Sequence, residues 1–243
     1  MEFTEGYFER NSRTARMIGE GGLAKLARAR VAVFGLGGVG SACAESLVRG
    51  GVGSFLFVDK DEVEPSNLNR QAVAFLSTMG RPKAEVMRAM ALDINPDVQV
   101  GALQEFVNAD NIDGLLGAFP KPDFIVDAFD TLSVKAELME YAARNGIRIV
   151  SAMGGANKTD PTLLEFADLA DTRICPLCRE MRKIARDRGI EGVTVLFSPE
   201  VPVKVPAKEG AERHEKTELG TLSYFPPTMG LMIAGYVIRE LLA

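Results

Sequence analysis

The feature that most constrains the fold of this chain is a glycine-rich turn placed directly after a short apolar run. Residues 31–34 (Val-Ala-Val-Phe) are apolar throughout and lead into Gly35-Leu-Gly-Gly-Val-Gly40, and residues 41–49 continue with a helical pattern. Residues 54–58 (Ser-Phe-Leu-Phe-Val) then predict a second buried strand. A strand, a glycine turn, a helix and a second strand within about thirty residues predict a βαβ unit.

Strands and helices continue to alternate further along the chain. After a polar loop over residues 59–70, the sequence predicts a helix over 82–93, a strand over 98–103, a strand over 124–126, a helix over 132–144 and a strand over 147–150. Such alternation predicts an α/β fold with a Rossmann-like, doubly wound and mostly parallel sheet. Ligands of such sheets bind at the carboxyl ends of the strands.

The pattern changes after residue 155. It predicts strands over 163–166 and 193–197, an exposed loop rich in Pro, Gly, Lys and Glu over 199–221, and a closing helix over 229–242. We therefore expect residues 1–155 to form the main domain and residues 156–243 to form a smaller C-terminal extension packed on the same core.

The charge distribution is uneven. The whole chain carries a net charge of −5, which argues against a protein that coats nucleic acid in general. Between Arg173 and Arg188, however, six basic residues accompany only two acidic ones. If this segment is helical, its basic residues Arg179, Arg182, Lys183 and Arg186 share one face. That face could hold phosphates, and a solvated charged face explains it equally well.

The cysteines and the apolar segments bear on the cellular compartment. Three cysteines in 243 residues do not make a disulfide framework, which favours a reducing compartment. The start Met-Glu-Phe-Thr-Glu lacks an export signal, and the apolar stretch over 229–238 is too short to cross a membrane. We expect a cytoplasmic protein without a membrane partner.

One pair of cysteines, Cys175 and Cys178, invites a closer look. Structural zinc normally takes four protein ligands, and the only other candidates are Cys43 and His214. The two cysteines have three interpretations: a zinc site, a redox pair, or two thiols that lie incidentally at the start of a helix. We expect that the two thiols lie there incidentally and serve no function, although Cys175 near a helix start could have a lowered pKa.

The glycine turn predicts a phosphate site. It lets the backbone approach a ligand closely, and it directs the N–H groups of the following helix at a phosphate. Asp59, at the end of the second strand, can accept hydrogen bonds from a ribose. These two features suit NAD, FAD and ATP equally, so they predict a nucleotide without identifying it.

Two further positions leave two interpretations open. Lys83 lies in the first turn of a predicted helix, where a cation opposes the helix dipole, so either a bound anion or solvent compensates it. Asp130 follows the strand over 124–126, where it can cap the next helix or hold Mg²⁺ beside a phosphate. Position alone does not decide between these interpretations.

Seven motifs in order give the first part of the chain a family resemblance. They are Arg10…Arg13, Gly35-Leu-Gly-Gly-Val-Gly40, Asp59-Lys-Asp61, Ser66-Asn-Leu-Asn-Arg-Gln71, Gly80-Arg-Pro-Lys83, Ile94-Asn-Pro96 and Val126-Asp-Ala-Phe-Asp130. Together they resemble the ubiquitin-activating-type (ThiF/MoeB-like) adenylyltransferase superfamily over residues 10–155. The resemblance implies that residues 1–155 are an ATP-binding adenylation domain with ATP and Mg²⁺ as cofactors.

The resemblance also assigns roles to single residues. Those implied to bind ATP are Gly35, Gly37, Gly38, Gly40, Asp59, Asp61, Asn67, Arg70 and Lys83. Those implied to act in catalysis are Arg13, Arg70, Lys83 and Asp130, and Asp130 is the implied Mg²⁺ ligand. Arg13 would reach into the site of the partner subunit, which implies a homodimer.

Motifs in the second half narrow the resemblance to one branch. They are Ser151-Ala-Met-Gly-Gly-Ala156, Asp160-Pro-Thr162, Asp168-Leu169, Cys175-Pro-Leu-Cys-Arg-Glu-Met-Arg-Lys183, Phe197-Ser-Pro-Glu200 and Leu219-Gly-Thr-Leu-Ser-Tyr-Phe-Pro-Pro227. This set resembles the tRNA threonylcarbamoyladenosine dehydratase branch, whose members adenylate the threonyl carboxylate on a modified adenosine. Ring closure then expels AMP, a ligase-type reaction that needs no enzyme thiolate.

The resemblance to this branch implies a binding partner for the protein and a role for the C-terminal extension. The partner would be tRNA carrying threonylcarbamoyladenosine, held by Arg179, Arg182, Lys183 and Arg186. Residues 156–243 would then bind tRNA and support dimerisation, and a sulfur-relay protein is left open as a further partner.

Three rival functions remain at this point. The first is an adenylyltransferase that activates the C-terminus of a ubiquitin-like sulfur carrier, but such enzymes typically have two Cys-x-x-Cys pairs and this chain has one. The second is an NAD-dependent oxidoreductase, which gives no joint role to Arg13, Arg70, Lys83 and Asp130. The third is a nucleotide-sensing or sulfur-relay scaffold without enzymatic activity.

Overall fold

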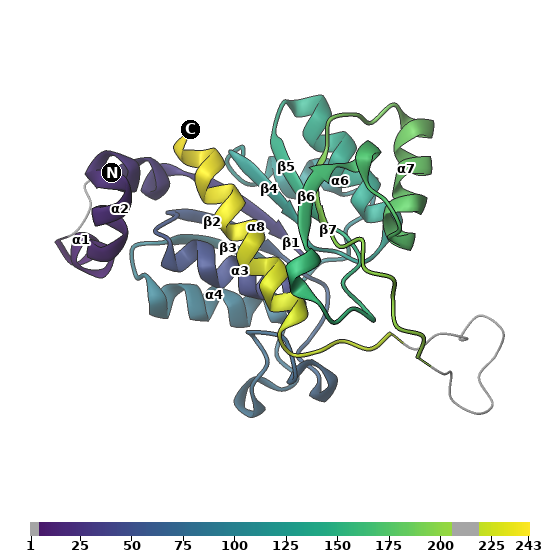
Figure 1. The fold of residues 1–243 in the computed structure, drawn as a ribbon. Coiled ribbons are helices and arrows are strands. Elements are labelled where there is room, and N and C mark those ends of the chain that lie inside the picture. Colours follow the sequence, from purple (N-terminus) through teal and green to yellow (C-terminus); the bar gives the residue numbers. More distant parts are fainter. Residues whose placement is uncertain (1–4, 206–218) are drawn as a thin grey trace.

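A seven-stranded sheet forms the centre of the molecule (Figure 1). The computed structural model describes residues 5–205 and 219–243. The sheet order is β3-β2-β1-β4-β5-β7-β6, with β1 Arg30–Phe34, β2 Ser54–Val58, β3 Gln99–Leu103, β4 Phe124–Asp127, β5 Arg148–Ala152, β6 Glu165–Asp168 and β7 Thr194–Phe197. Every neighbouring pair is parallel except β6 with β7. The predicted Rossmann-like, doubly wound and mostly parallel α/β sheet is confirmed.

Helices cover both faces of this sheet. Val31 and Val33 of β1 belong to a hydrophobic cluster with α3 Gly38–Arg49, α4 Lys83–Ile94 and α8 Phe225–Leu242. Ala32 and Phe34 belong to a second cluster, with α5 Ile112–Gly117 and α6 Leu132–Asn145. Because alternate residues of a strand point to opposite faces, these two sets of helices lie on opposite sides of the sheet. α7 Pro176–Arg188 packs with α6 in a third cluster.

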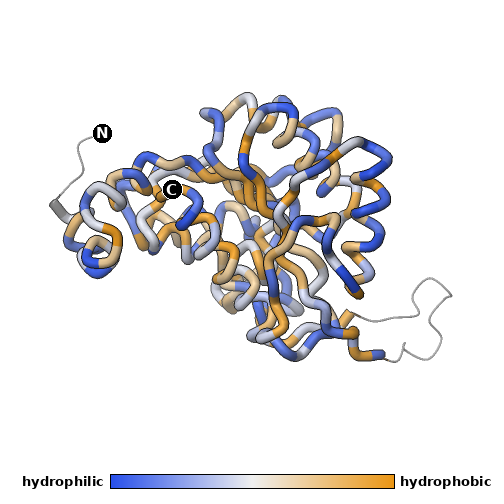
Figure 2. Tube along the Cα trace, turned by 45° about the horizontal axis from the view of Figure 1, so that its top comes forward, coloured by the Kyte–Doolittle hydropathy of each residue, from blue (hydrophilic) through white to orange (hydrophobic). Residues whose placement is uncertain are grey.

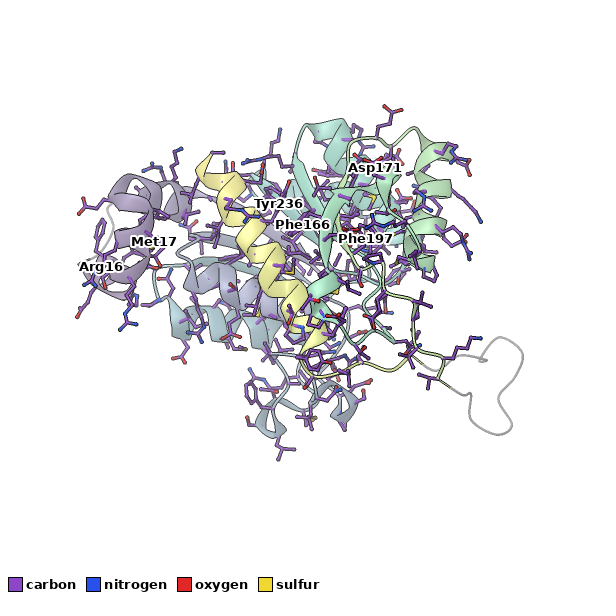
Figure 3. All side chains as sticks on the ribbon, viewed as in Figure 1. Arg16, Met17, Phe166, Asp171, Phe197 and Tyr236 are labelled. Carbon is purple, nitrogen blue, oxygen red and sulfur yellow. The ribbon has the colours of Figure 1, made fainter. Side chains whose placement is uncertain are left out.

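The hydrophobic residues gather along the central strands, and hydrophilic residues mark the outer turns of the helices (Figure 2). Phe166 of β6 stacks on Tyr236 of α8 with ring centroids 4.9 Å apart, which attaches the outermost strand to the closing helix (Figure 3). Within residues 5–205 and 219–243, no helix is both long enough and apolar enough to span a bilayer.

Most predicted elements are present, and the differences have local causes. The strand expected over 163–166 begins only at Glu165, because Pro161–Leu163 form a 3-10 turn in which the Asp160 carboxylate accepts the Thr162 N–H. The helix expected from residue 41 begins at Gly38. The short helix α5 was not predicted. Of the loop expected over 199–221, residues 206–218 lie outside the described residues, as does His214.

The first two helices, α1 Glu5–Arg10 and α2 Ser12–Arg28, lie at the amino ends of the strands. The Tyr7 hydroxyl donates to Gly51 O at 2.8 Å, just before β2 begins. Arg10 pairs with Asp97, just before β3 begins. α2 itself leads directly into β1, so both helices pack at the edge of the sheet opposite to the carboxyl ends.

The sheet continues across residue 155. β5, which precedes that position, pairs in parallel with β7, which follows it. α8, at the end of the chain, packs along α3, which belongs to the first part of the chain (Figure 1). Residues 156–243 therefore share the core of the first part, and a functional division into two domains stays a prediction.

A glycine lets α8 lie against α3. A Cβ atom added at Gly230 would lie 2.3 Å from Val39 O and 2.9 Å from Cys43 N, both backbone atoms of α3. A Cβ added at Gly235, five residues further along α8, would meet no described atom within 4 Å outside the nearby backbone of the helix itself. The two glycines of one helix therefore face very different surroundings.

We expect Gly230→Ala and Gly235→Ala to change stability in opposite directions. Gly230→Ala forces two backbones apart and should lower the free energy of unfolding by about 1–3 kcal/mol. Gly235→Ala reduces the freedom of the unfolded chain and should raise it by about 0.5–1 kcal/mol. Urea unfolding followed by circular dichroism measures both. A Gly230→Ala protein as stable as the parent would contradict this packing of α8 on α3.

Candidate functional site

The carboxyl ends of β1 and β4 meet where the strand order reverses. β1 pairs with β2 on one side and with β4 on the other, so the loops that follow β1 and β4 lie next to each other. A Cβ added at Gly35 would lie 2.8 Å from the carbonyl carbon of Ala128, in the loop after β4. In sheets of this kind, such a switch point is where ligands bind.

The glycine turn is built for close backbone contact. Gly35 has a φ of 87°, a region that side chains disfavour. A Cβ added at Gly40 would lie 1.7 Å from Gly35 O, so the first turn of α3 fits only without one. Gly37 is the N-cap of α3, and no side chain caps that end. The N–H groups at the start of α3 can therefore serve an anion, as the sequence predicted.

Asp59 lies at the end of β2, beside the glycine turn. Its two carboxylate oxygens accept the N–H of Leu36 at 2.5 Å and the N–H of Asp61 at 2.8 Å. Burial raises the pKa of Asp59, and these hydrogen bonds together with the nearby Lys83 ammonium counteract the rise. A carboxylate has about four acceptor positions, so Asp59 keeps capacity for the hydroxyl groups of a ribose.

Lys83 is held close to Asp61 by a pairing of two loops. Val63 N donates to Arg81 O, and Lys83 N donates to Asp61 O at 3.0 Å. The Lys83 side chain is only 6% exposed, and its Nζ lies 3.2 Å from Asp61 Oδ2. A solvated surface lysine, one of the two interpretations left open by the sequence, is therefore wrong. Asp61, by contrast, is exposed.

Asn67 and Arg70 lie in the loop that faces α3. Asn67 is 6% exposed, and its Oδ1 accepts Glu64 N, which gives it a structural task in a 3-10 turn. The Arg70 guanidinium donates to Ser66 O at 2.8 Å and to Asn69 Oδ1 at 2.9 Å. A Cβ added at Gly38 would lie 3.2 Å from Arg70 Cγ, so the Arg70 stem crosses the start of α3.

Gln71 is a candidate residue that the sequence analysis did not single out. It is 7% exposed, and its Oε1 has no hydrogen-bond partner among the described residues. Its Nε2 lies 4.0 Å from a Cβ added at Gly37. A buried amide oxygen without a partner is costly unless a ligand or water satisfies it. Its place directly after Arg70 in the loop motif was the available signal.

Asp127, the last residue of β4, and Asp130, in the loop that follows, have different surroundings. Asp127 is fully buried and accepts from Lys135 Nζ at 2.9 Å and from Ser151 Oγ at 2.5 Å, so it fixes the loop. Asp130 is exposed, and it forms no ion pair within the described part of the chain. Thr131 is the N-cap of α6 and no side chain caps that helix, so the interpretation of Asp130 as a helix cap is wrong.

Arg13 lies away from the glycine turn of its own chain. It is exposed on α2, which packs at the amino ends of the strands. Arg16 of the same helix lies at the far end of the molecule from the carboxyl-end loops (Figure 3).

The basic helix α7 lies apart, beyond β7. The four predicted residues lie at helical spacing, and Arg179 and Lys183 both pair with Glu180. Arg182 is half-buried, and its guanidinium donates to Thr172 O at 2.7 Å. Arg186 is exposed and forms no ion pair with any described residue.

A surface hollow of about 440 Å³ adjoins the site. It lies between α3, residues 68–72 and the start of α8, and Arg70 forms part of its wall. The glycine turn, Asp59 and Asp130 do not line it, so it is a neighbouring feature. Leu68 and Leu231 at the hollow are 42% and 55% exposed.

These residues form a site with a positive and a negative part. The helix terminus of α3, Arg70 and Lys83 can hold phosphates, and Asp59 can hold a ribose. Asp130 offers an exposed carboxylate, which accepts from Thr131 Oγ1 at 3.3 Å. Such an arrangement can bind a nucleoside triphosphate together with a hard cation.

Known proteins share both the sequence and the fold. The tRNA threonylcarbamoyladenosine dehydratase of Bacillus subtilis is 40% identical over 240 residues, which are 95% of this chain and 94% of that protein. The Escherichia coli protein of that name is 31% identical over 260 residues, 99% of this chain and 96% of that protein. The sulfur carrier protein ThiS adenylyltransferase of Escherichia coli is 33% identical, over only 48% of this chain.

Solved structures extend this similarity to three dimensions. The Escherichia coli dehydratase in complex with ATP has a TM-score of 0.89 at 31% identity, and its complex with AMP has a TM-score of 0.90 at 32% identity. Each comparison covers 100% of this chain and 97% of that one. A family model also matches residues 8–243. On these grounds the chain belongs to the ThiF family.

Proposed function

We propose that this protein is an ATP-dependent tRNA threonylcarbamoyladenosine dehydratase, an adenylating enzyme of the ligase type. The observation that carries the proposal is the free N-terminus of α3 at the β1–β4 switch point, with Lys83 and Asp59 beside it. Full-length similarity to dehydratases of two bacteria supports the same function, as does the fold shared with ATP and AMP complexes.

ATP would bind across the carboxyl ends of β1 and β2. The backbone at Gly35, Gly37, Gly38 and Gly40 would contact its phosphates, and Asp59 would bind its ribose. Arg70, Lys83 and Asn67 would bind the phosphates from the opposite side. The salt bridge from Lys83 to Asp61 keeps the ammonium in place before ATP arrives. The unpaired Gln71 Oε1 offers a further contact beside the glycine turn.

Asp130 is the proposed Mg²⁺ ligand. Its carboxylate is exposed, caps no helix and follows the strand next to the glycine turn, so the donor type and the place fit a hard cation. When bound, Mg²⁺ would neutralise charge on the phosphates. The Asp127–Lys135 ion pair fixes the loop that carries Asp130.

The chemistry begins with the threonyl carboxylate of the modified adenosine. A carboxylate oxygen attacks the α-phosphorus of ATP, the bond to pyrophosphate breaks, and an acyl adenylate forms. A nucleophilic atom of the same threonylcarbamoyl group then attacks the activated carbonyl carbon and expels AMP. The net change in the nucleoside is the loss of one water. Arg70 and Lys83 stabilise the negative charge that develops at phosphorus.

The tRNA would lie along the basic face of α7. Arg179, Lys183 and Arg186 are exposed at helical spacing, and Arg186 has no acidic partner among the described residues. Arg182 contributes less directly, because its guanidinium already bonds Thr172. Such a face suits the phosphates of an RNA backbone. A sulfur-relay protein stays a further proposed partner.

A homodimer would complete the site. Arg13 belongs to α2, which lies at the amino ends of the strands, whereas the glycine turn lies at their carboxyl ends (Figure 1). A second copy would therefore supply Arg13 to the site. The hollow beside Arg70 and the exposed Leu68 and Leu231 offer a surface for that copy. The proposed location is the cytoplasm, where modified tRNA and ATP are both present.

The decisive experiment is mass spectrometry of nucleosides from threonylcarbamoyladenosine-containing tRNA after incubation with enzyme, ATP and Mg²⁺. We expect a product lighter by one water, together with AMP and pyrophosphate. Asp130→Asn should lower the rate about 100-fold or more with unchanged thermal unfolding. Asp93→Asn, an exposed aspartate on α4, is the matched control and should leave the rate unchanged.

The same experiment separates the rival adenylyltransferase. ATP–pyrophosphate exchange is measured with modified tRNA and, separately, with a ubiquitin-like carrier that ends in Gly-Gly. Exchange stimulated by the carrier alone would contradict the proposed substrate. Tight NAD binding without ATP binding would contradict the adenylation itself.

The basic face of α7 makes a separate prediction. Lys183→Ala and Arg186→Ala should each weaken tRNA binding for all tRNA sequences alike, and each should reduce the salt dependence of log K by about one unit. Arg88→Ala, which removes an exposed arginine from α4, is the control. Binding is measured by filter retention at several salt concentrations. Equal effects of all three changes would argue against α7 as the tRNA surface.

A mixing experiment tests the shared site. Arg13→Ala and Asp130→Ala proteins should each be inactive, and a mixture that exchanges subunits should regain activity. If Arg13 acts in the partner's site, half of the dimers in an equal mixture hold one intact site each, so about a quarter of the parent activity returns. No recovery, despite subunit exchange shown by native mass spectrometry, would place Arg13 in its own site.

A further inference from the structure

Cys175 and Cys178 form a cluster that the proposed function does not use. Cys175 is the N-cap of α7, Pro176 occupies the first helical position, and Cys178 follows in the same turn. Both thiols are buried, at 1% and 0% exposure. Their side chains hydrogen bond each other across the first turn of α7. The sequence alone favoured incidental thiols, and their surroundings argue otherwise.

The surroundings of Cys175 Sγ stabilise a thiolate. The sulfur accepts hydrogen bonds from the Cys178 thiol, the Cys178 N–H and the Gly154 N–H, and the Lys158 ammonium lies nearby. These interactions, led by the bond from the Cys178 thiol, hold the pKa of Cys175 below its usual value although burial opposes them. The start of a helix adds its positive dipole end. These groups together would bind an anion, and here the anion that they stabilise is the Cys175 thiolate.

Lys158 supplies the positive charge of this cluster. It is 3% exposed, and its Nζ donates to Ser198 O at 2.6 Å. Burial lowers the pKa of Lys158, and Cys175, Cys178 and Glu200 counteract that shift. Glu200 is engaged by Thr159 N and Asp160 N. A buried ammonium needs an anionic partner, and the Cys175 thiolate is one at hand.

A strained turn holds Cys175 in place. Ile174 has a φ of 62°, which is rare for a β-branched residue. Cys175 N donates to Arg173 O at 2.6 Å, so these residues form a γ-turn around Ile174. Ile174 is 56% exposed, so its side chain lies largely in solvent. Opening this turn relieves the strain and exposes the sulfur to small molecules.

Cys178 connects the pair to the basic face of α7. The hydrogen bond to Cys175, followed by burial, raises the pKa of Cys178, so Cys178 keeps its proton. It also lies beside the Thr172 hydroxyl, which donates to Leu169 O at 2.7 Å and accepts from Arg182 Nη1 at 2.5 Å. A change at Cys178 therefore reaches a guanidinium on the outer side of the helix.

We propose that Cys175 and Cys178 are a reversible dithiol–disulfide site, oxidised by exchange with low-molecular-weight disulfides. The pattern Cys-Pro-Leu-Cys at a helix start, one thiol that keeps its proton and one that is stabilised without it, is suited to such exchange. The proposal needs neither tRNA nor ATP, so it stands or falls independently of the proposed function.

The exchange proceeds in two steps that balance. The Cys175 thiolate attacks one sulfur of the small disulfide, the bond between its two sulfurs breaks, and one small thiolate leaves. The Cys178 sulfur, after losing its proton to that thiolate, attacks Cys175 Sγ and displaces the second small thiolate, which takes up a proton from solvent. Two protein thiols are oxidised by two electrons, and one small disulfide is reduced to two thiols.

Oxidation should loosen the start of α7. The disulfide removes the thiolate beside Lys158 and the hydrogen bond from the Cys178 thiol to Cys175 Sγ. The buried ammonium then loses an anionic partner, which destabilises the packing around residues 154–158. We expect faster amide hydrogen exchange at residues 172–179 in the oxidised protein.

The test uses the full chain equilibrated with glutathione buffers of increasing disulfide content. We expect the intact mass to fall by two hydrogen atoms, with peptide mapping placing the bond between Cys175 and Cys178, and dithiothreitol should reverse it. Cys178→Ser should instead accumulate a mixed disulfide with glutathione at Cys175. In the native protein, iodoacetamide should alkylate Cys175 at least about tenfold faster than Cys43.

Cys43 is the internal control. It lies in the middle of α3 at 0% exposure, and burial raises its pKa without any charged partner to counteract it. Lys158→Met should slow the alkylation of Cys175 and leave that of Cys43 unchanged. Three free thiols at the most oxidising glutathione ratio would overturn the proposal. So would a disulfide that includes Cys43, or a soft metal ion bound to the pair in the purified protein.

Discussion

The contact between the loops after β1 and β4 is the constraint on which the rest of the site depends. Gly35 lies so close to the backbone of Ala128 that no side chain fits between them, and Gly40 approaches Gly35 O just as closely. These two contacts fix where α3 begins and leave its first N–H groups uncapped. Asp59, Lys83 and Asp130 are then brought to that point by the ends of β2, the loop paired with it, and β4. A larger residue at Gly35 or Gly40 would displace all of them together.

Much of this arrangement could be predicted from the sequence, because it depends on local patterns. Apolar runs gave the strands, and residues directly after a strand necessarily lie at its carboxyl end, which located Asp59 and Asp130. The burial of Lys83 could not be predicted, because it depends on the pairing of residues 61–63 with 80–83. Gln71 was missed for a similar reason, since only the fold shows that its Oε1 lies buried without a partner. The late start of β6 depends on the Asp160–Thr162 hydrogen bond, which overrides the apolar pattern.

Three buried lysines illustrate why a charge pattern alone is ambiguous. Lys135 is paired with Asp127, fully buried, and it serves the structure of the β4–α6 loop. Lys83 is paired with the exposed Asp61, so the pair can open toward a ligand. Lys158 has a backbone carbonyl and two thiols as neighbours, and its charge favours a thiolate. In the sequence all three are single lysines at or near the start of a helix or loop. Each buried lysine has a different partner in the folded protein, and that partner determines whether the ammonium serves structure, ligand binding or the stabilisation of a thiolate.

The C-terminal helix links the nucleotide site to the rest of the extension. Pro226 at the start of α8 would lie 2.8 Å from a Cβ added at Gly38, so α8 presses on the glycine turn from outside. The same helix stacks on β6 through Tyr236 and Phe166. β6 in turn pairs with β7, and β6 leads along the chain through the Leu169–Asp171 turn into α7. The glycine turn, α8, β6 and β7 therefore belong to one continuously packed unit. Residues 156–243 therefore pack on the same core as the strands and helices of the first part.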